Sequence, residues 1–242
     1  MCGRFSLVTT SDELAAEFDI LDIDPYLAPR YNIAPTQMVA AIRIQEGTGR
    51  REVASLRWGF VPSWAKDASG AARMINARSE TVATSAAFRA AFKARRCLVP
   101  CSGFIEWARP SENPKAKGRP HFIHRPDQHV FAMAGIWERW QQPDGNTMDT
   151  LAILTTSPNR MMESIHNRMP VILERDDYTV WLDQSRIDVG GLLCPASVEL
   201  IATAISKRVN SPKHDDPACL APAKSDDEPP AQFSLDFDQT NT

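Results

Sequence analysis

The sequence predicts an α+β fold, a single compact domain in which mainly antiparallel sheets curl in a barrel-like manner and helices flank them. Strand-like segments cluster along the chain instead of alternating strictly with helices, which disfavours a parallel α/β arrangement. A chain of 242 residues can bury one sizeable core, and no linker or internal repeat divides it before residue 212. One domain is therefore the simplest organisation.

The first half of the chain predicts a helix, a hairpin and a second helix. Residues 11–18 combine an N-cap signal with helical spacing of apolar residues. Residues 37–44 and 51–58 have strand-like composition and flank the turn EGTGR, so we expect them to pair. Ser79 is expected to cap an alanine-rich helix that runs through about Arg95.

The second half of the chain returns to strands. Strand-like segments separated by turns lie at residues 97–100, 103–107, 121–125, 129–137 and 150–156. Helices are expected to start near Pro158, Asp176 and Ser197 and to close the domain.

Charge is distributed unevenly along the chain. Residues 213–242 hold two lysines against seven acidic residues, a charge of −5, which leaves 25 basic and 23 acidic residues, or +2, on the remainder. From Pro212 onward the composition also shifts to Pro, Asp, Ala and Ser. We expect a folded domain over residues 1–222 and an acidic, proline-rich disordered tail over 223–242. Because the folded part is only mildly basic, any nucleic-acid contact must come from local clusters of Arg and Lys.

The compartment follows from apolar runs and cysteines. The longest apolar runs fall well short of the roughly 20 residues of a membrane span, and no basic-then-apolar leader precedes them. Five irregularly spaced cysteines do not form a disulfide framework. We expect a cytoplasmic monomer with no membrane partner, nucleoid-associated if the source is bacterial.

The second residue carries distinctive chemistry. Cells generally remove an initiator Met that precedes a residue as small as Cys, which would make Cys2 the first residue. Its α-amine, with an ordinary pKa of about 7.7 to 8.0, and its thiol, about 8.5, would both be partly nucleophilic near neutrality. Together they can close a thiazolidine ring on the carbon of an aldehyde. From MCGRF alone, a cysteine at this position by chance is the alternative.

Motifs in the rest of the chain favour a functional Cys2 over a cysteine at this position by chance. A series of motifs spans residue 1 to about 217: MCGRF, RYNIAPTQ, LRWGFVPSW, INARSET, RRCLVPCSGFIEW, AGIWE, TTSPNRMMESIHNRMPVIL and RVNSPKHDDP. In these motifs the sequence resembles the SOS response-associated peptidase (SRAP) family, the abasic-site processing proteins. Departures are PCSGFIEW for the usual PAxGFYEW, WGF for WGL, and Pro158 at a usual Ala position.

The resemblance implies a catalytic group around Cys2, composed of Asn76, Glu106 and His166. Glu106 would protonate the ring oxygen of the sugar, since an apolar strand raises a carboxyl pKa; a surface Glu is the alternative. His166 would move protons during imine formation, although a lone His is often a packing or capping residue. Asn76 would hold the amine or the sugar without adding charge, although a turn residue is the plain alternative.

The partner implied by the resemblance is single-stranded DNA that contains abasic sites. Arg4, Arg73 and Arg78 would bind phosphates through planar guanidinium groups, with solubility as the competing explanation. Trp64 and Trp107 would offer faces on which bases stack, although most Trp residues are core residues.

The implied activity is a thiazolidine cross-link that shields the lesion, with residual AP lyase activity. A cysteine peptidase that uses Cys2 and His166, acting on its own Met1, is a rival, and so is a non-covalent DNA-binding module. Strand alternation explains Cys97 with Cys101, and His121 with His124, as well as zinc would, so we expect no metal and no cofactor. Cys101 is a second candidate nucleophile. Residues Gln232 to Phe237 resemble peptides that dock on bacterial sliding clamps, although chance is the simpler reading of so short a motif.

Overall fold

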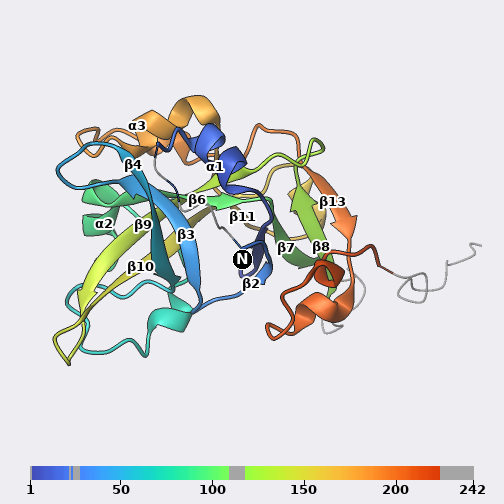
Figure 1. Ribbon diagram of the computed structural model, residues 1–242, viewed down its shortest axis with the longest axis horizontal. Coiled ribbons are helices and arrows are strands. Elements are labelled where there is room, and N and C mark those ends of the chain that lie inside the picture. The colour runs from blue at the N-terminus through green and yellow to red at the C-terminus, as the bar shows by residue number, and fades with distance from the viewer. Residues whose placement is uncertain (1, 22, 24–27, 109–117, 224–242) are drawn as a thin grey trace, which may run out of the picture.

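The computed structural model describes residues 2–21, 23, 28–108 and 118–223 and has the predicted α+β architecture (Figure 1). Its strands form two sheets, one of five strands in the order β13-β8-β7-β1-β2 and one of eight that includes a closed barrel. The site described below lies where residues from both sheets meet.

The barrel is the larger core of the molecule. Its strands pair in the order β10-β4-β3-β6-β9, and β9 pairs with β10 to close the ring. The β10–β4 contact is parallel and the other four are antiparallel. Barrel and edge strands are β3 (Met38–Ile44), β4 (Arg51–Trp58), β5 (Asn76–Arg78), β6 (Arg96–Cys101), β9 (Phe131–Gln141), β10 (Thr147–Thr156), β11 (Met169–Pro170) and β12 (Ile172–Leu173). The predicted barrel-like curling is confirmed.

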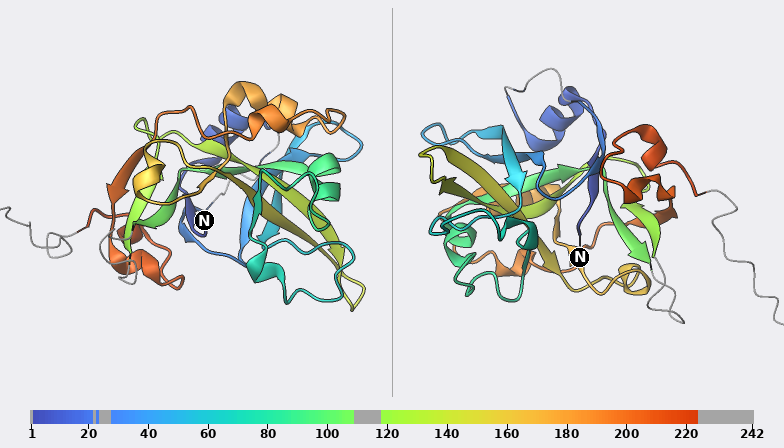
Figure 2. Two further views of the ribbon diagram at one scale, coloured as in Figure 1. Left: turned by 180° about the vertical axis from the view of Figure 1, so that it is seen from behind. Right: turned by 90° about the horizontal axis from the view of Figure 1, so that it is seen from below.

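The five-stranded sheet is antiparallel and contains the start of the chain. Its strands are β1 (Phe5–Leu7), β2 (Arg30–Ile33), β7 (Gly103–Ala108), β8 (Arg119–His124) and β13 (Ile201–Ala204). In the right-hand view of Figure 2, the dark-blue β1 runs between the barrel and the green β8. Residues near the N-terminus therefore lie at the junction of the two sheets.

The chain passes from the barrel to the second sheet at Ser102 and Gly103. A Cβ on Gly103 would lie 2.4 Å from the Phe122 ring, so no larger residue fits without a shift. The Ser102 N–H donates to Ser6 O at 2.9 Å, and the Ile105 N–H donates to Arg4 O at 2.9 Å. These bonds fix the first residues of the chain against the strand that carries Glu106.

Helices are short and lie outside the sheets. α1 (Ser11–Phe18) has a capping box in which the Thr10 hydroxyl accepts from Glu13 N and the Glu13 carboxylate accepts from Thr10 N. The other helices are α2 (Arg89–Ala94) and α3 (Tyr178–Leu182), with 3-10 turns η1 (Ala71–Arg73), η2 (Met162–Ser164), η3 (Arg175–Asp177), η4 (Gly190–Leu192), η5 (Lys207–Asn210) and η6 (Pro217–Cys219).

The helix predicted near Asp176 is present, but three other predicted helices are corrected. Within the helix predicted from Ser79 to about Arg95, residues 79–87 form turns and only α2 is helical. The β-branched and Ser residues in TVATS weaken a continuous helix there. Near Pro158 the chain makes only the single turn η2. After Ser197 it forms β13 instead of a helix, because pairing with β8 overrides local preference.

Within the described ranges no helix has the length and apolar character needed to cross a membrane. Residues 224–242, which include the motif from Gln232 to Phe237 and nearly all of the predicted tail, lie outside the described residues, as does Met1.

Candidate functional site

Cys2 lies just before β1 and is fully buried. Its thiol lies 4.0 Å from Arg4 O. Burial raises the pKa of the Cys2 thiol far above its ordinary value, and the negative charge of Glu106 raises it further. This pKa shift applies to the chain that carries Met1, and the expectation of a partly ionised thiol after Met1 removal stays a prediction.

Asn76 holds the backbone of Cys2. It begins β5, which runs parallel to β10 with Asn76 opposite Ile153. Its Nδ2 donates to Cys2 O at 2.8 Å. Its Oδ1 is buried and has no hydrogen-bond partner among the described residues, so Asn76 keeps one unused acceptor.

Glu106 is buried on β7, with 4% of its surface exposed. Burial raises the pKa of the Glu106 carboxyl above its ordinary value, while the nearby His166 opposes this shift. Since the same carboxylate also raises the pKa of the Cys2 thiol, Glu106 lies within electrostatic range of both residues. The alternative of an exposed surface Glu is thereby excluded.

His166 follows the turn η2, and its orientation is fixed by its own backbone segment. The backbone N–H of His166 donates to Met162 O at 2.8 Å, and its ring Nδ1 accepts from the backbone N–H of Arg168 at 3.0 Å. An Nδ1 that accepts leaves Nε2 as the nitrogen that carries the proton in the neutral ring. Arg168 pins this loop, because its guanidinium donates to Thr155 O at 2.5 Å and to both Glu80 carboxylate oxygens at 2.5 and 2.9 Å.

Cys2 and the three residues predicted around it thus come from four distant parts of the chain to one place. Cys2 precedes β1, Asn76 is on β5, Glu106 is on β7 and His166 lies between η2 and β11. Together they provide a thiol, a carboxyl with a raised pKa, an imidazole and an amide. Such a set can protonate an oxygen, move protons and hold a carbonyl carbon beside the cysteine.

Arg4 and Trp107 are engaged with other residues of the protein. Arg4 Nη1 donates to Asn32 Oδ1 at 2.6 Å and to Val209 O at 2.8 Å, and its guanidinium lies 5.7 Å from the Trp107 ring centroid. Burial lowers the pKa of Arg4. Trp107 donates from Nε1 to Asn210 Oδ1 at 2.7 Å and packs on the face of β7 opposite to Glu106. The structure therefore does not bring Trp107 to the Glu106 side of β7.

The segment around Asn76 carries three exposed residues that were predicted to bind DNA: Trp64, Arg73 and Arg78. Trp64 is 70% exposed in the loop after β4. Arg73 ends η1 and Arg78 ends β5, two residues beyond Asn76, and both are exposed. Their side chains are accessible, as contact with a ligand requires, and their roles remain predictions.

A buried polar network that sequence reasoning missed holds Arg4 in place. Asn32 is fully buried and donates from Nδ2 to the carbonyls of Val209, Ser211 and His214 at 3.2, 3.0 and 2.6 Å. Asp215 accepts from the backbone N–H groups of Tyr31 and Asn32 at 2.6 and 2.9 Å and pairs with Arg30. RYN and KHDD were visible in the sequence as motifs, but only their distant pairing gives them this function.

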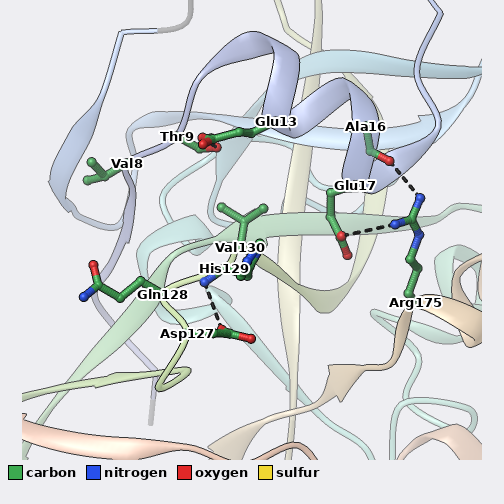
Figure 3. Close-up of a pocket in the computed structure, with 10 residues that line it drawn as sticks. All are labelled: Val8, Thr9, Glu13, Ala16, Glu17, Asp127, Gln128, His129, Val130 and Arg175. Carbon is green, nitrogen blue, oxygen red and sulfur yellow. Dashed lines mark hydrogen bonds and ion pairs between the residues drawn. The ribbon is translucent and has the colours of Figure 1, made fainter.

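One cavity lies away from the cysteine site. It has a volume of about 550 Å³, lies between α1 and the turn before β9, and is lined by neither Cys2 nor the three residues around it (Figure 3). Its acidic groups already have partners: Glu13 closes the helix cap, Asp127 accepts from His129 N, and Glu17 pairs with Arg175. Among the described residues no group of three His, Cys, Asp or Glu could hold a metal ion.

Fold and site together define a protein with a cysteine-centred site between a barrel and a second sheet. The chain belongs to the SRAP family, because the family model described as SOS response associated peptidase (SRAP) matches residues 1–212. The resemblance seen in the sequence is thereby confirmed.

Relatives of known name match most of this chain. The abasic site processing protein YoqW of Bacillus subtilis (strain 168) is 40% identical over 229 residues, which cover 91% of this chain and 99% of YoqW. The abasic site processing protein HMCES of Xenopus tropicalis is 28% identical over 232 residues, 83% of this chain and 68% of HMCES. A crystal structure of a Bacteroides thetaiotaomicron protein matches with a TM-score of 0.80 at 26% identity, covering 92% of this chain and 100% of the other.

Proposed function

We propose that this protein processes abasic sites in single-stranded DNA by forming a covalent bond through Cys2 after Met1 is removed. The observation that carries the proposal is the convergence of Asn76, Glu106 and His166 on Cys2. The names of the relatives supply the substrate class, since YoqW and HMCES are both abasic site processing proteins.

The reaction uses two nucleophiles on one residue. The α-amine of Cys2 adds to the sugar aldehyde at C1′, and the resulting carbinolamine loses water to give an imine. The thiol sulfur then adds to the same carbon, and its proton passes to nitrogen, which closes a thiazolidine ring. One aldehyde, one amine and one thiol thus give the ring and one water. The amine attacks first, because the thiol adds to the imine carbon that this attack creates, and a base takes the thiol proton.

Three neighbouring side chains assist these steps. Glu106, with its raised carboxyl pKa, donates a proton to the ring oxygen of the closed sugar and exposes the aldehyde. His166 moves protons when the carbinolamine loses water and when the thiol adds. Asn76 anchors Cys2 through its carbonyl and presents an unused acceptor, Oδ1, to the amine.

Ring closure determines the fate of the DNA strand. An imine acidifies the neighbouring carbon of the sugar and leads to strand cleavage by β-elimination, which is AP lyase activity. Thiol addition removes the imine, so the main product is an intact strand with a shielded lesion and cleavage is the minor route.

Intact mass spectrometry before and after incubation with an abasic oligonucleotide tests the proposal. We expect a chain that lacks Met1 and, after incubation, a species heavier by one oligonucleotide less one water. A chain that retains Met1 and still holds the oligonucleotide irreversibly would contradict the mechanism. An oligonucleotide without an abasic site is the control and should add no mass.

A further inference from the structure

Strand β8 places two basic residues on the same face as Glu106. In the β7–β8 register, Phe104 pairs with Ile123, Glu106 with His121 and Ala108 with Arg119. Side chains directly opposite each other in an antiparallel pair share a face. Since Phe104 and Ile123 are fully buried in the main core, the column Ile123, His121, Arg119 leads outward from that core beside Glu106.

Arg119 is unusual in the state of its guanidinium. Its Nε and Nη2 are both buried, yet neither has a hydrogen-bond partner among residues 2–21, 23, 28–108 and 118–223. Among the residues that the structure describes, no other side chain has two such atoms. Nε and Nη2 form one edge of the guanidinium, the edge that can bind two oxygens of a single anion in parallel.

Leaving these two donors without partners costs free energy in the free protein. A buried donor without an acceptor destabilises a fold, and the more so when the group is charged. Such a cost persists at sites where a ligand supplies the missing acceptors. The edge of Arg119 is therefore complementary to an anion that arrives beside Glu106.

We propose that Arg119 binds a phosphate directly adjoining the abasic sugar, and so sets the position of that sugar against Cys2. This inference rests on the proposed function, which supplies a phosphodiester on each side of the reacting sugar. The two non-bridging oxygens of one phosphodiester match the two donors of the guanidinium edge. Side chains that shield the edge shift when the strand enters, a common change at interfaces.

Binding of an uncleavable abasic analogue tests this role separately from the covalent chemistry. A single strand with a tetrahydrofuran residue has no aldehyde, so its affinity is measurable by fluorescence anisotropy even if no cross-link forms. We expect Arg119→Gln to weaken this binding on the order of tenfold. The matched control is Arg50→Gln, which removes the same charge from the exposed β3–β4 turn and should leave affinity nearly unchanged.

Replacing single phosphates identifies the contact. An uncharged methylphosphonate on one side of the tetrahydrofuran should weaken binding to the wild type by a similar factor and leave binding to Arg119→Gln unchanged. Unaltered affinity of Arg119→Gln, or additive losses at both positions, would overturn the proposal.

Thermal stability separates this role from a structural one. Because the variant removes two unsatisfied donors, its Tm should equal or exceed that of the wild type. A large fall in Tm together with additive losses would show that Arg119 supports the fold only. Failure of the cross-link with normal analogue binding would count against the proposed chemistry and not against Arg119.

Discussion

At the scale of single residues, the site depends on two buried ionisable groups, the Cys2 thiol and the Glu106 carboxyl. Burial raises the pKa of both groups. A carboxyl with a raised pKa suits a general acid, and a buried thiol suits a second nucleophile that acts only after the imine has formed. The roles of amine and thiol should therefore separate in a variant that lacks only sulfur.

Cys2→Ala keeps the α-amine and removes the thiol. We expect this variant to form an imine that survives only after borohydride reduction, and to cleave more of the abasic strand than the wild type does. A denaturing gel of heated samples with and without borohydride measures both products. A heat-stable adduct without borohydride would contradict the order of steps. Cys101→Ala is the matched control and should retain the stable adduct, because Cys101 is the buried second candidate nucleophile.

Glu106→Gln should slow the cross-linking reaction and stabilise the folded protein. The carboxyl has a higher pKa in the folded protein than its ordinary 4.5, so the folded state binds more protons than the unfolded state between these two values. Stability therefore falls as pH rises through this window, and the cost is fully present above the folded pKa. We expect Glu106→Gln to raise Tm at pH 7.5 but not at pH 4, and to lower the cross-linking rate at least about a hundredfold.

The control for Glu106 is Glu46→Gln, an exposed carboxyl on the β3–β4 turn whose replacement should leave Tm and rate unchanged at both pH values. A lower Tm for Glu106→Gln at pH 7.5 would show that the ionised carboxylate stabilises the fold, against the present assignment.

At the scale of elements, the loop between η2 and β11 controls where His166 lies. Arg168 ties this loop to the end of β10 through Thr155 O and to Glu80 beyond β5. The hydrogen bonds from Arg168 lower the pKa of Glu80 to about 2. The stabilisation from this pair is therefore fully present above pH 4.5 and is lost as pH falls toward 2. Because half of the Glu80 side chain is exposed, most of the constraint comes from the contact with Thr155 O.

Arg168→Ala should slow cross-linking more than Glu80→Gln does. The first change frees the loop that carries His166 and removes one of the two donors to Thr155 O, whereas the second removes only a solvent-exposed partner. We expect a loss of rate on the order of tenfold for Arg168→Ala and less than about twofold for Glu80→Gln. Single-turnover cross-linking rates at saturating DNA measure this difference. Equal rates would remove Arg168 as a positioning residue, and Arg160→Ala, exposed in the same segment, is the control.

Elements also show what the sequence could predict. The helix at Ser11–Phe18 and the β3–β4 hairpin follow from local signals, a cap with periodic apolar residues and two strands around a glycine turn. The helix expected after Ser197 is wrong because pairing with β8, some 80 residues earlier, decides that segment. The grouping of Asn76, Glu106 and His166 was predicted from motif resemblance. Asn32 and Arg119 carried no local signal in the sequence. Asn32 matters through hydrogen bonds to distant residues, and Arg119 matters because two of its donors have no partner among the described residues.

At the scale of the whole molecule, the site is held by contacts between the first and last parts of the folded chain. Asn32 and Asp215 join the segment after residue 208 to β2, and through Arg4 this network reaches the residues beside Cys2. The barrel contributes Asn76 from its edge strand β5, and the second sheet contributes Glu106. The site therefore needs the complete fold, and loss of any of these connections should affect reactivity before it unfolds the barrel.

Charge at this scale predicts how binding responds to salt. The region before residue 213 carries only +2, so attraction to DNA depends on local cations such as the exposed Arg73 and Arg78 near Asn76. Each phosphate contact on single-stranded DNA contributes about 0.7 to the slope of log affinity against log salt concentration. We expect Arg73→Gln and Arg78→Gln each to reduce the slope by about that amount, measured with the tetrahydrofuran strand over a salt titration. A wild-type affinity that does not change with salt would remove both assignments. Arg50→Gln should keep the wild-type slope, because a charge on the distant β3–β4 turn is screened beyond about 10 Å at 0.1 M salt.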